Sequence, residues 1–289
     1  QVKLFTSNKQ HLEETKDFVP ESDGHKVVYD QVVGSGWNHN DFTYDGGKIT
    51  GWSEQGNKTR LENHDLVIPS YNPETLEPIT EVGDNAFKIP DGEWEQGKDS
   101  VDSPNGMETV TFPDTLEVIG EYAFRYNSLK TLDFPASLTT IKTSAFNSNK
   151  LETLVLPDTI TTVEEGAFST NDITSLTLSK GLTELSQGVF SMNINLTHVD
   201  IPDSIVTIGD MAFAGARLET LEIPKSVTKI GRKAFHLHHL QKLTIPGNVK
   251  EIGDSAFEGT FKAITLKELV LEEGIETIGT YAFKEGYLE

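Results

Sequence analysis

Two groups of side chains in this sequence have types and spacings suited to metal chemistry. One is a histidine cluster, and imidazole nitrogens are common metal ligands. Its members are His236, His238 and His239. The other is an acidic segment that follows Phe87, and carboxylate oxygens are the ligands that calcium prefers. Its carboxylates include Asp91, Glu93, Asp99 and Asp102.

The sequence around each group favours an interpretation without a metal. A metal site needs ligands that converge from a scaffold and are supported by a second shell, and the three histidines fall in a variable turn, so we expect a solvated turn there. The acidic segment lacks the D-x-D-x-D-G spacing of an EF-hand loop, so we expect a solvated loop. Its aromatic residue, Trp94, is the one that we expect to touch a partner, because tryptophan is enriched in binding hot spots.

Catalytic motifs are missing from the sequence. Neither G-x-S-x-G, H-E-x-x-H, a P-loop nor a G-x-G-x-x-G fingerprint occurs in a suitable context, and the Gly34-Ser-Gly36 turn is too short to cradle a phosphate. The absence of cysteine removes thiol nucleophiles, disulfides and zinc-thiolate sites. We therefore predict a protein that is not an enzyme and that has neither a cofactor nor a metal site.

The charge balance restricts the class of partner. The 289 residues contain 24 Lys and Arg against 45 Asp and Glu, a formal net charge of −21. Such a surface repels phosphates, so it does not favour nucleic acid or anionic lipid as a partner. The sequence also has no apolar run long enough to span a membrane, and its first residues lack the pattern of a signal peptide.

The elements that must position all these side chains are set by an internal repeat. An Ala-Phe or closely similar dipeptide recurs, and most of its copies are 22 or 23 residues apart. Its phenylalanines are Phe87, Phe124, Phe146, Phe168, Phe190, Phe213, Phe235, Phe257 and Phe283. The full unit reads L-x-x-L-x-I-P-x-S-V-x-x-I-G-x-x-A-F, as in residues 218–235.

Each part of the unit predicts a piece of one coil. The alternation in L-x-x-L-x-I predicts a short strand, which the following proline ends. A second short apolar pair follows, and the glycine after it, such as Gly231, is expected to supply a backbone bend. Ala-Phe then lies in a turn or a brief helix, with phenylalanine between neighbouring coils. Because a single coil cannot bury its own apolar face, the coils are expected to stack into a solenoid at about 4.8 Å per coil.

The repeat resembles the BspA-like, Treponema-type leucine-rich repeats of bacterial cell-surface proteins, and residues 41–51 with 65–69 are similar to the entry to such arrays in Gram-positive ones. The resemblance is clear over residues 107–289 and degenerate over 61–106, and the copies lack the Asn or Cys ladder position of commoner leucine-rich repeats. It implies an α+β leucine-rich-repeat solenoid, a right-handed coil of short parallel strands joined by turns or short helices. It also implies a surface adhesion or host-interaction module.

The organisation along the chain follows from where the repeat begins and stops. Residues 1–60 are not repeats, and we expect them to cap the first coil with a hairpin around Tyr44 and a short helix opened by Ser53. Residues 61–106 form a degenerate first repeat with the acidic insertion. Residues 107–289 form eight repeats of about 22 residues, and we expect the sequence to be a fragment truncated at its C-terminus.

The outward positions of the L-x-x-L-x-I strand form two columns on one face of the predicted solenoid. Threonine dominates the N-terminal part, where it simply suits an exposed strand. Charged residues replace it toward the C-terminus, and solenoids commonly bind partners on such a face. These candidate binding residues are His198, Asp200, Glu222, Lys242 and Glu268.

The leading functional hypothesis is a bacterial surface adhesin that binds host cells or extracellular matrix through the elongated solenoid face. On this hypothesis the chain is extracellular, monomeric and not inserted in the membrane, and its partner is a host cell-surface or matrix protein. Two alternatives stay open: a structural stalk that displays another domain, and a non-catalytic region of a secreted enzyme.

Overall fold

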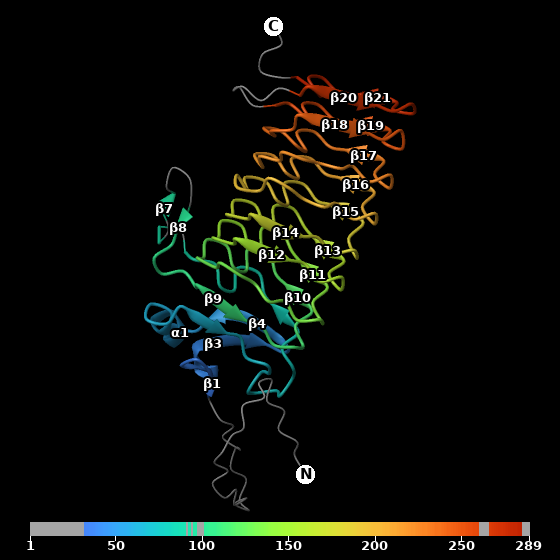
Figure 1. Cartoon of the computed structure of the whole chain (residues 1–289). Coiled ribbons are helices and arrows are strands. Elements are labelled where there is room, and N and C mark those ends of the chain that lie inside the picture. Colours follow the sequence, from blue (N-terminus) through green and yellow to red (C-terminus); the bar gives the residue numbers. More distant parts are fainter. Residues whose placement is uncertain (1–31, 91, 94, 97–100, 260–265, 285–289) are drawn as a thin grey trace, which may run out of the picture.

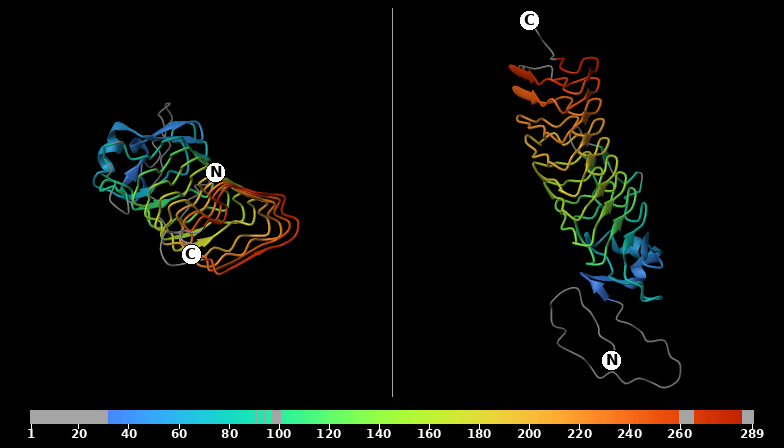
Figure 2. Two further views of the ribbon diagram at one scale, coloured as in Figure 1. Left: turned by 90° about the horizontal axis from the view of Figure 1, so that it is seen from above. Right: turned by 90° about the vertical axis from the view of Figure 1, so that its right-hand side faces the viewer.

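The chain folds into an elongated rod of stacked coils, seen here in a computed structural model (Figure 1). The structure describes residues 32–90, 92–93, 95–96, 101–259 and 266–284. Figure 2 shows that successive coils lie over one another with a gradual sideways offset, so the rod is one continuous stack. No helix among these residues is both long enough and apolar enough to cross a membrane.

Two parallel ladders lie along the rod, each with interruptions, and the predicted L-x-x-L-x-I strand does not form at residues 131–135, 197–201 and 219–223. The first ladder contains the L-x-x-L-x-I strands, which pair coil to coil as β5 (Asp65–Val67) with β9 (Thr109–Thr111), β12 (Thr153–Val155) with β14 (Ser175–Thr177), and β18 (Lys242–Ile245) with β20 (Glu268–Leu271). The second ladder contains two-residue strands, most of which end at the apolar residue before the glycine, whereas Lys142, Glu164 and Ser186 follow three of them. The strands of this ladder are β6 (Glu81–Val82), β10 (Val118–Ile119), β11 (Thr140–Ile141), β13 (Thr162–Val163), β15 (Glu184–Leu185), β16 (Thr207–Ile208), β17 (Lys229–Ile230), β19 (Glu251–Ile252) and β21 (Thr277–Ile278).

The repeated phenylalanines form the axis of the core, as the sequence predicts. Those from Phe87 to Phe257 are at most 1% exposed, and each ring lies 5.1–5.8 Å from the ring in the next coil, from Phe87 through to Phe283. The Ala-Phe residues lie in turns rather than helices. Each coil therefore buries its aromatic ring against its two neighbours, which a single coil could not do.

A buried asparagine ladder accompanies the phenylalanines, so the prediction that this ladder is missing was wrong. Its members, three residues after phenylalanine, are Asn127, Asn149, Asn171 and Asn193. The Nδ2 of Asn149 donates to the carbonyls of Phe124 and Phe146, and its Oδ1 accepts from the amide of Leu129. These bonds satisfy backbone groups that the turns leave without a partner in the ladders. The sequence obscures this ladder because Ala216 and His238 occupy its next two positions.

The glycine after the second strand does not bend the backbone as predicted. Gly231 has no positive φ, and a Cβ added to it would lie 2.5–2.6 Å from atoms of Gly209 and Asp210 in the preceding coil. The close approach of two coils therefore leaves no room for a side chain at this position. The left-handed residue comes two positions later, as at Lys233 with φ 55°.

The predicted hairpin and helix are both present at the N-terminal end. Strands β3 (Phe42–Asp45) and β4 (Lys48–Trp52) form an antiparallel hairpin, and β4 pairs in parallel with β6 at the end of the second ladder. Helix α1 (Glu54–Thr59) begins after Ser53, whose Oγ accepts from the amide of Gly56 at 3.0 Å. The other elements there are β1 (Val32–Gly34), β2 (Trp37–Asn38) and the 3-10 helix η1 (His39–Asp41). In the insertion, β7 (Glu95–Gln96) and β8 (Val101–Asp102) are antiparallel.

Candidate functional site

The outward positions of the first ladder form the two exposed columns that the sequence predicts. In β12 and β14, Leu154 is buried and Leu176 half-buried, whereas Thr153 and Ser175 on one side of them are exposed and paired in register. The same alternation places Lys242 and Glu268 opposite each other on β18 and β20. Where these strands pair, each coil therefore presents an exposed side chain next to its counterpart on the neighbouring coil.

The charged members of these columns are linked from coil to coil. The imidazole of His198 lies 2.9 Å from the Oγ1 of Thr220 and 3.1 Å from the Oδ1 of Asp200. The ammonium of Lys242 lies 2.6 Å from the Oε2 of Glu268, and this hydrogen bond raises the pKa of Lys242. Glu222 is exposed in the same column as Asp200, one coil further along. We call these five charged residues the strand-face patch: His198, Asp200, Glu222, Lys242 and Glu268.

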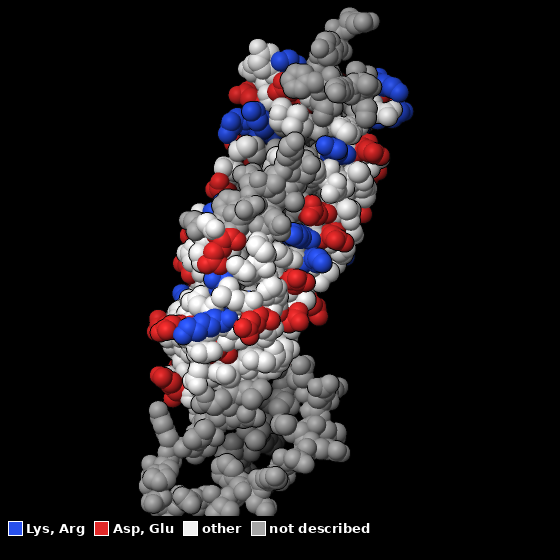
Figure 3. All heavy atoms as spheres, turned by 90° about the vertical axis from the view of Figure 1, so that its left-hand side faces the viewer, with Lys and Arg blue, Asp and Glu red and all other residues white. Residues whose placement is uncertain are grey.

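The strand-face patch is suited to non-covalent binding. Its side chains are mostly exposed, with fractions of 57% for His198, 95% for Asp200 and 76% for Lys242. Exposed ion pairs stabilise a fold by about 1 kcal/mol at most, so these charges are not explained by a need for stability. Figure 3 shows, on the left-hand side of the rod as it is seen in Figure 1, that acidic and basic side chains are interspersed along its length.

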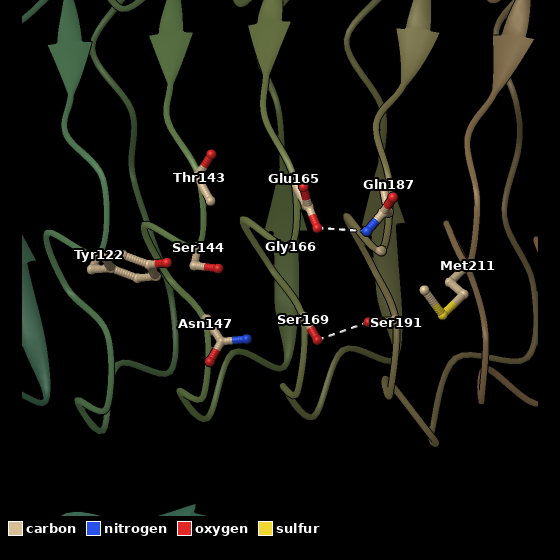
Figure 4. Close-up of a pocket in the computed structure, with 11 residues that line it drawn as sticks. Tyr122, Thr143, Ser144, Asn147, Glu165, Gly166, Ser169, Gln187, Ser191 and Met211 are labelled. Atoms are coloured by element: carbon tan, nitrogen blue, oxygen red, sulfur yellow. Dashed lines mark hydrogen bonds between the residues drawn. The ribbon is translucent and has the colours of Figure 1, made fainter. Parts of the chain in front are cut away.

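A second surface feature, which the sequence reasoning missed, lies on the turns in the middle of the rod. It is a hollow of about 350 Å³ with Gly166 and Gly188 in its lining, and Figure 4 shows it between Tyr122 and Met211. The signal that could have found it is the position of these glycines. In these two coils the glycine directly precedes Ala-Phe or Val-Phe, whereas in most coils it stands two residues earlier.

Comparison with known families identifies the repeat. The model of the BspA-type leucine-rich repeat region, with six copies, matches residues 102–216 and 168–289. The chain belongs to this family.

Solved structures show the same fold. A leucine-rich repeat protein from Bacteroides ovatus superposes with a TM-score of 0.55 at 20% identity, covering 84% of this chain and 77% of that one. A leucine rich cell surface protein from Faecalibacterium prausnitzii gives 0.52 at 21% identity, covering 82% and 69%. A search of curated proteins found no match. At these identities the likeness supports the BspA-type solenoid fold alone.

The histidine cluster of this BspA-type array does not form the solvated turn that the sequence predicts. His238 is 2% exposed and takes the next ladder position after Ala216. Its Nε2 donates to the carbonyl of Phe257 at 2.8 Å, while its Nδ1 accepts from the amide of Leu240 at 2.9 Å. Burial lowers the pKa of His238 to about 4, which keeps this ring neutral. The described residues contain no group of three or more His, Cys, Asp or Glu that could hold a metal ion.

The acidic insertion is tied to the N-terminal region at one carboxylate. Glu93 receives two hydrogen bonds, at 2.9 and 3.1 Å, from the Nη2 of Arg60, which is 4% exposed. The expectation of a fully solvated loop was therefore wrong for Glu93. Asp91, Trp94 and Asp99 lie outside the described residues, as does the side chain of Asp102, so the expectation for Trp94 stays a prediction.

Proposed function

We propose that the chain is a bacterial surface module that binds a host cell-surface or extracellular-matrix protein through the strand-face patch. The observation that supports this most is the display of exposed charges from neighbouring coils on one side of the rod, where Lys242 and Glu268 are paired in register and His198 contacts Thr220 of the next coil. Family membership adds support, since BspA-type solenoids are repeat scaffolds, and the structural neighbour from Faecalibacterium prausnitzii is described as a cell surface protein. On this proposal the chain works outside the cell, as a monomer.

The mechanism is recognition by complementarity. The stacked coils fix the backbone, so the ordering cost when a partner docks is limited to the side chains of the patch. The net charge of −21 favours association with a basic partner surface and makes the association rate sensitive to salt. We expect a few anchor residues in the patch to contribute most of the binding free energy.

The test measures saturable binding of the purified chain to epithelial cells and to immobilised matrix proteins. A triple variant, Asp200→Ala, Glu222→Ala and Lys242→Ala, should weaken binding about tenfold or more, because several anchors are lost together. The matched control is Lys229→Ala, Glu251→Ala and Glu276→Ala, which removes the same charges on the side of the second ladder. Lys229 pairs with Glu251 at 3.0 Å there, and both are about half exposed.

The control variant should bind as the unchanged chain does. If the two triple variants lose binding equally, the strand-face patch is not the binding site. If the unchanged chain binds no tested cell or matrix protein, the proposal fails and the structural stalk becomes the better hypothesis.

A further inference from the structure

The turn face of the rod carries its own column of side chains. In each coil, the residue two positions before the core phenylalanine has a left-handed backbone with φ between 52° and 62°. Most coils place a residue with a side chain there, such as Tyr122, Ser144, Met211, Lys233 or Ser255. The column therefore normally covers the turn face with one side chain from each coil.

Two adjacent coils in the middle of the rod break this pattern. Their sequences are Val163-Glu164-Glu165-Gly166 and Leu185-Ser186-Gln187-Gly188, so glycine occupies the left-handed position and a residue with a side chain occupies the close-packed position. The second ladder is interrupted at the same place: in the described part of the chain, β13 and β15 are not paired with each other.

The surface is hollowed where the two side chains are missing. Figure 4 shows Tyr122 and Met211 at opposite ends of the hollow of about 350 Å³, with Gly166 between them. A second hollow, of about 380 Å³, adjoins it and shares Thr143, Glu165 and Gln187 in its lining. We call the two hollows together the central groove. Each is within the range of roughly 300–1,000 Å³ typical of small-molecule sites.

The polar side chains of the central groove are held in place by bonds between coils. The Nε2 of Gln187 donates to the Oε1 of Glu165 at 2.6 Å, and the hydroxyls of Ser169 and Ser191 lie 2.8 Å apart. Carboxylates and amides can each make about four hydrogen bonds, so these fixed groups can also bind ligand hydroxyls.

Arg125 holds two side chains that line the groove, those of Asn147 and Tyr122. Its Nε donates to the Oδ1 of Asn147 at 3.1 Å, and Figure 4 shows the amide nitrogen of Asn147 pointing into the hollow. Its guanidinium also lies 5.2 Å from the ring centre of Tyr122. An aromatic ring and an amide donor are thereby held beside the same hollow.

The lining excludes several classes of ligand. Among the described residues, neither hollow is lined by a lysine or an arginine, whereas Glu164, Glu165 and Glu184 supply carboxylates. Phosphorylated, sulfated and other anionic ligands are therefore repelled. The apolar lining is limited to Tyr122, Leu185 and Met211, too little to seat the apolar face of a helical peptide.

We propose that the central groove binds an uncharged oligosaccharide. Such a ligand is rich in hydroxyls that both donate and accept, which suits the carboxylate, amide and serine groups of the lining. The C–H faces of its sugar rings can pack on the ring of Tyr122, and its lack of charge avoids repulsion by the three glutamates. This site is distinct from the strand-face patch, so it does not depend on the protein-binding function proposed above.

The test is a printed array of uncharged, sialylated and sulfated glycans, followed by calorimetry of the full chain with each glycan that binds. Binding should be confined to uncharged glycans. Gly188→Met should weaken it about tenfold or more, because its side chain would occupy the hollow. Met211 adopts this backbone conformation at the equivalent position, so the fold should tolerate the change. The matched control is Lys233→Met, which places the same residue in the same column outside the groove.

Three outcomes would overturn this proposal: no uncharged glycan binds, the bound glycans are mainly sialylated or sulfated, or Gly188→Met binds as tightly as Lys233→Met. Tyr122→Ala gives a second readout and should weaken binding without shifting the calorimetric stoichiometry. The strand-face triple variant should keep its glycan binding, so failure of one proposal is distinguishable from failure of the other. Circular dichroism of each variant confirms that the solenoid is intact.

Discussion

His238 shows how one residue can take over a structural position and change its pH dependence. The asparagines of the ladder do not titrate, but the imidazole that replaces them does. In the folded chain the Nδ1 of His238 must stay unprotonated, because it accepts a hydrogen bond from the amide of Leu240. Burial lowers the pKa of His238 most, the hydrogen bond to the Phe257 carbonyl opposes this shift, and repulsion from His239 and His236 lowers the pKa further.

We predict that His238 makes the fold less stable in mild acid. Its pKa is about 4 in the folded chain against 6.5 unfolded, so between these values the unfolded chain binds a proton that the folded chain does not. The stability present above pH 6.5 is therefore lost as the pH falls toward 4, by about 3 kcal/mol in total. His238→Asn should remove this loss, as measured by urea unfolding between pH 7.5 and 4.5.

The difference in unfolding free energy between the unchanged chain and His238→Asn isolates the effect of His238 from that of other titrating groups. His236, whose pKa is also lowered by burial, and Glu258 are present in both, so their contributions cancel in the difference. His198→Asn, at an exposed position, controls for the exchange of histidine for asparagine itself. A difference between the unchanged chain and His238→Asn that stays constant with pH would contradict the prediction.

At the scale of the coil, the two glycine positions have different physical origins. Gly231 is required because the preceding coil's backbone lies against it. At Gly166 the main constraint on the residue type is the left-handed backbone conformation. Ser144, Lys233 and Ser255 show that side chains are accepted at the second position. Glycine is thus needed at Gly231, where the preceding coil also carries glycine, although Lys142, Glu164 and Ser186 occupy the equivalent position in three other coils; at the left-handed position glycine is optional.

We predict that Gly231→Ala destabilises the fold by about 1–3 kcal/mol or more, because its Cβ would force two coils apart. Gly166→Ser is the matched control, since a Cβ there would lie 3.1 Å from the flexible hydroxyl of Ser144, and its effect should be smaller. The midpoint of urea unfolding gives both values. Equal destabilisation by the two variants would show that backbone conformation, rather than coil contact, is what Gly231 provides.

At the scale of the whole molecule, the fold could be predicted because the repeat uses residue types with few alternatives. Leucine and isoleucine at alternating positions specify which side chains face the core, although no strand forms at residues 131–135, 197–201 and 219–223, and the phenylalanine of Ala-Phe specifies the axis of the core. The asparagine ladder could not be read in the same way, since Ala216 and His238 interrupt it. The central groove forms because two neighbouring coils have glycine at the left-handed position. Its shape is visible only after the coils are stacked.

The strand-face patch could be predicted from the sequence only in part. Period-2 alternation correctly predicts that Asp200 and Lys242 are exposed, because adjacent side chains on a strand point to opposite sides. The pairing of Lys242 with Glu268 required the register of β18 and β20, because these two residues are 26 positions apart and most repeats are 22 residues long. The identity of a partner requires chemistry that exposure alone does not supply, so binding at this patch stays a prediction.

The N-terminal aromatic cluster supports the last prediction, which concerns the whole rod. Trp52 lies 4.9 Å from the ring of Trp37 and 4.7 Å from that of Phe87, so the hairpin continues the phenylalanine stack at its first coil. Because coils contact only their neighbours, loss of these contacts should weaken the nearest coils first. We therefore predict that Trp52→Ala increases amide hydrogen exchange most in the coils of Phe87 and Phe124, and much less in that of Phe235.

The matched control for this gradient in hydrogen exchange is Phe235→Ala. It also removes a buried aromatic ring, but far from the N-terminal cluster. It should increase exchange around Phe213 and Phe257 and leave the coil of Phe87 protected, because each coil draws its stability from local contacts. Each substitution removes a large aromatic ring and should cost about 3–5 kcal/mol locally, less for Trp52 where its ring is partly exposed. Uniform exchange along the rod in both variants would mean that the solenoid unfolds as one cooperative unit, and the N-terminal hairpin would then stabilise every coil equally rather than protect the first.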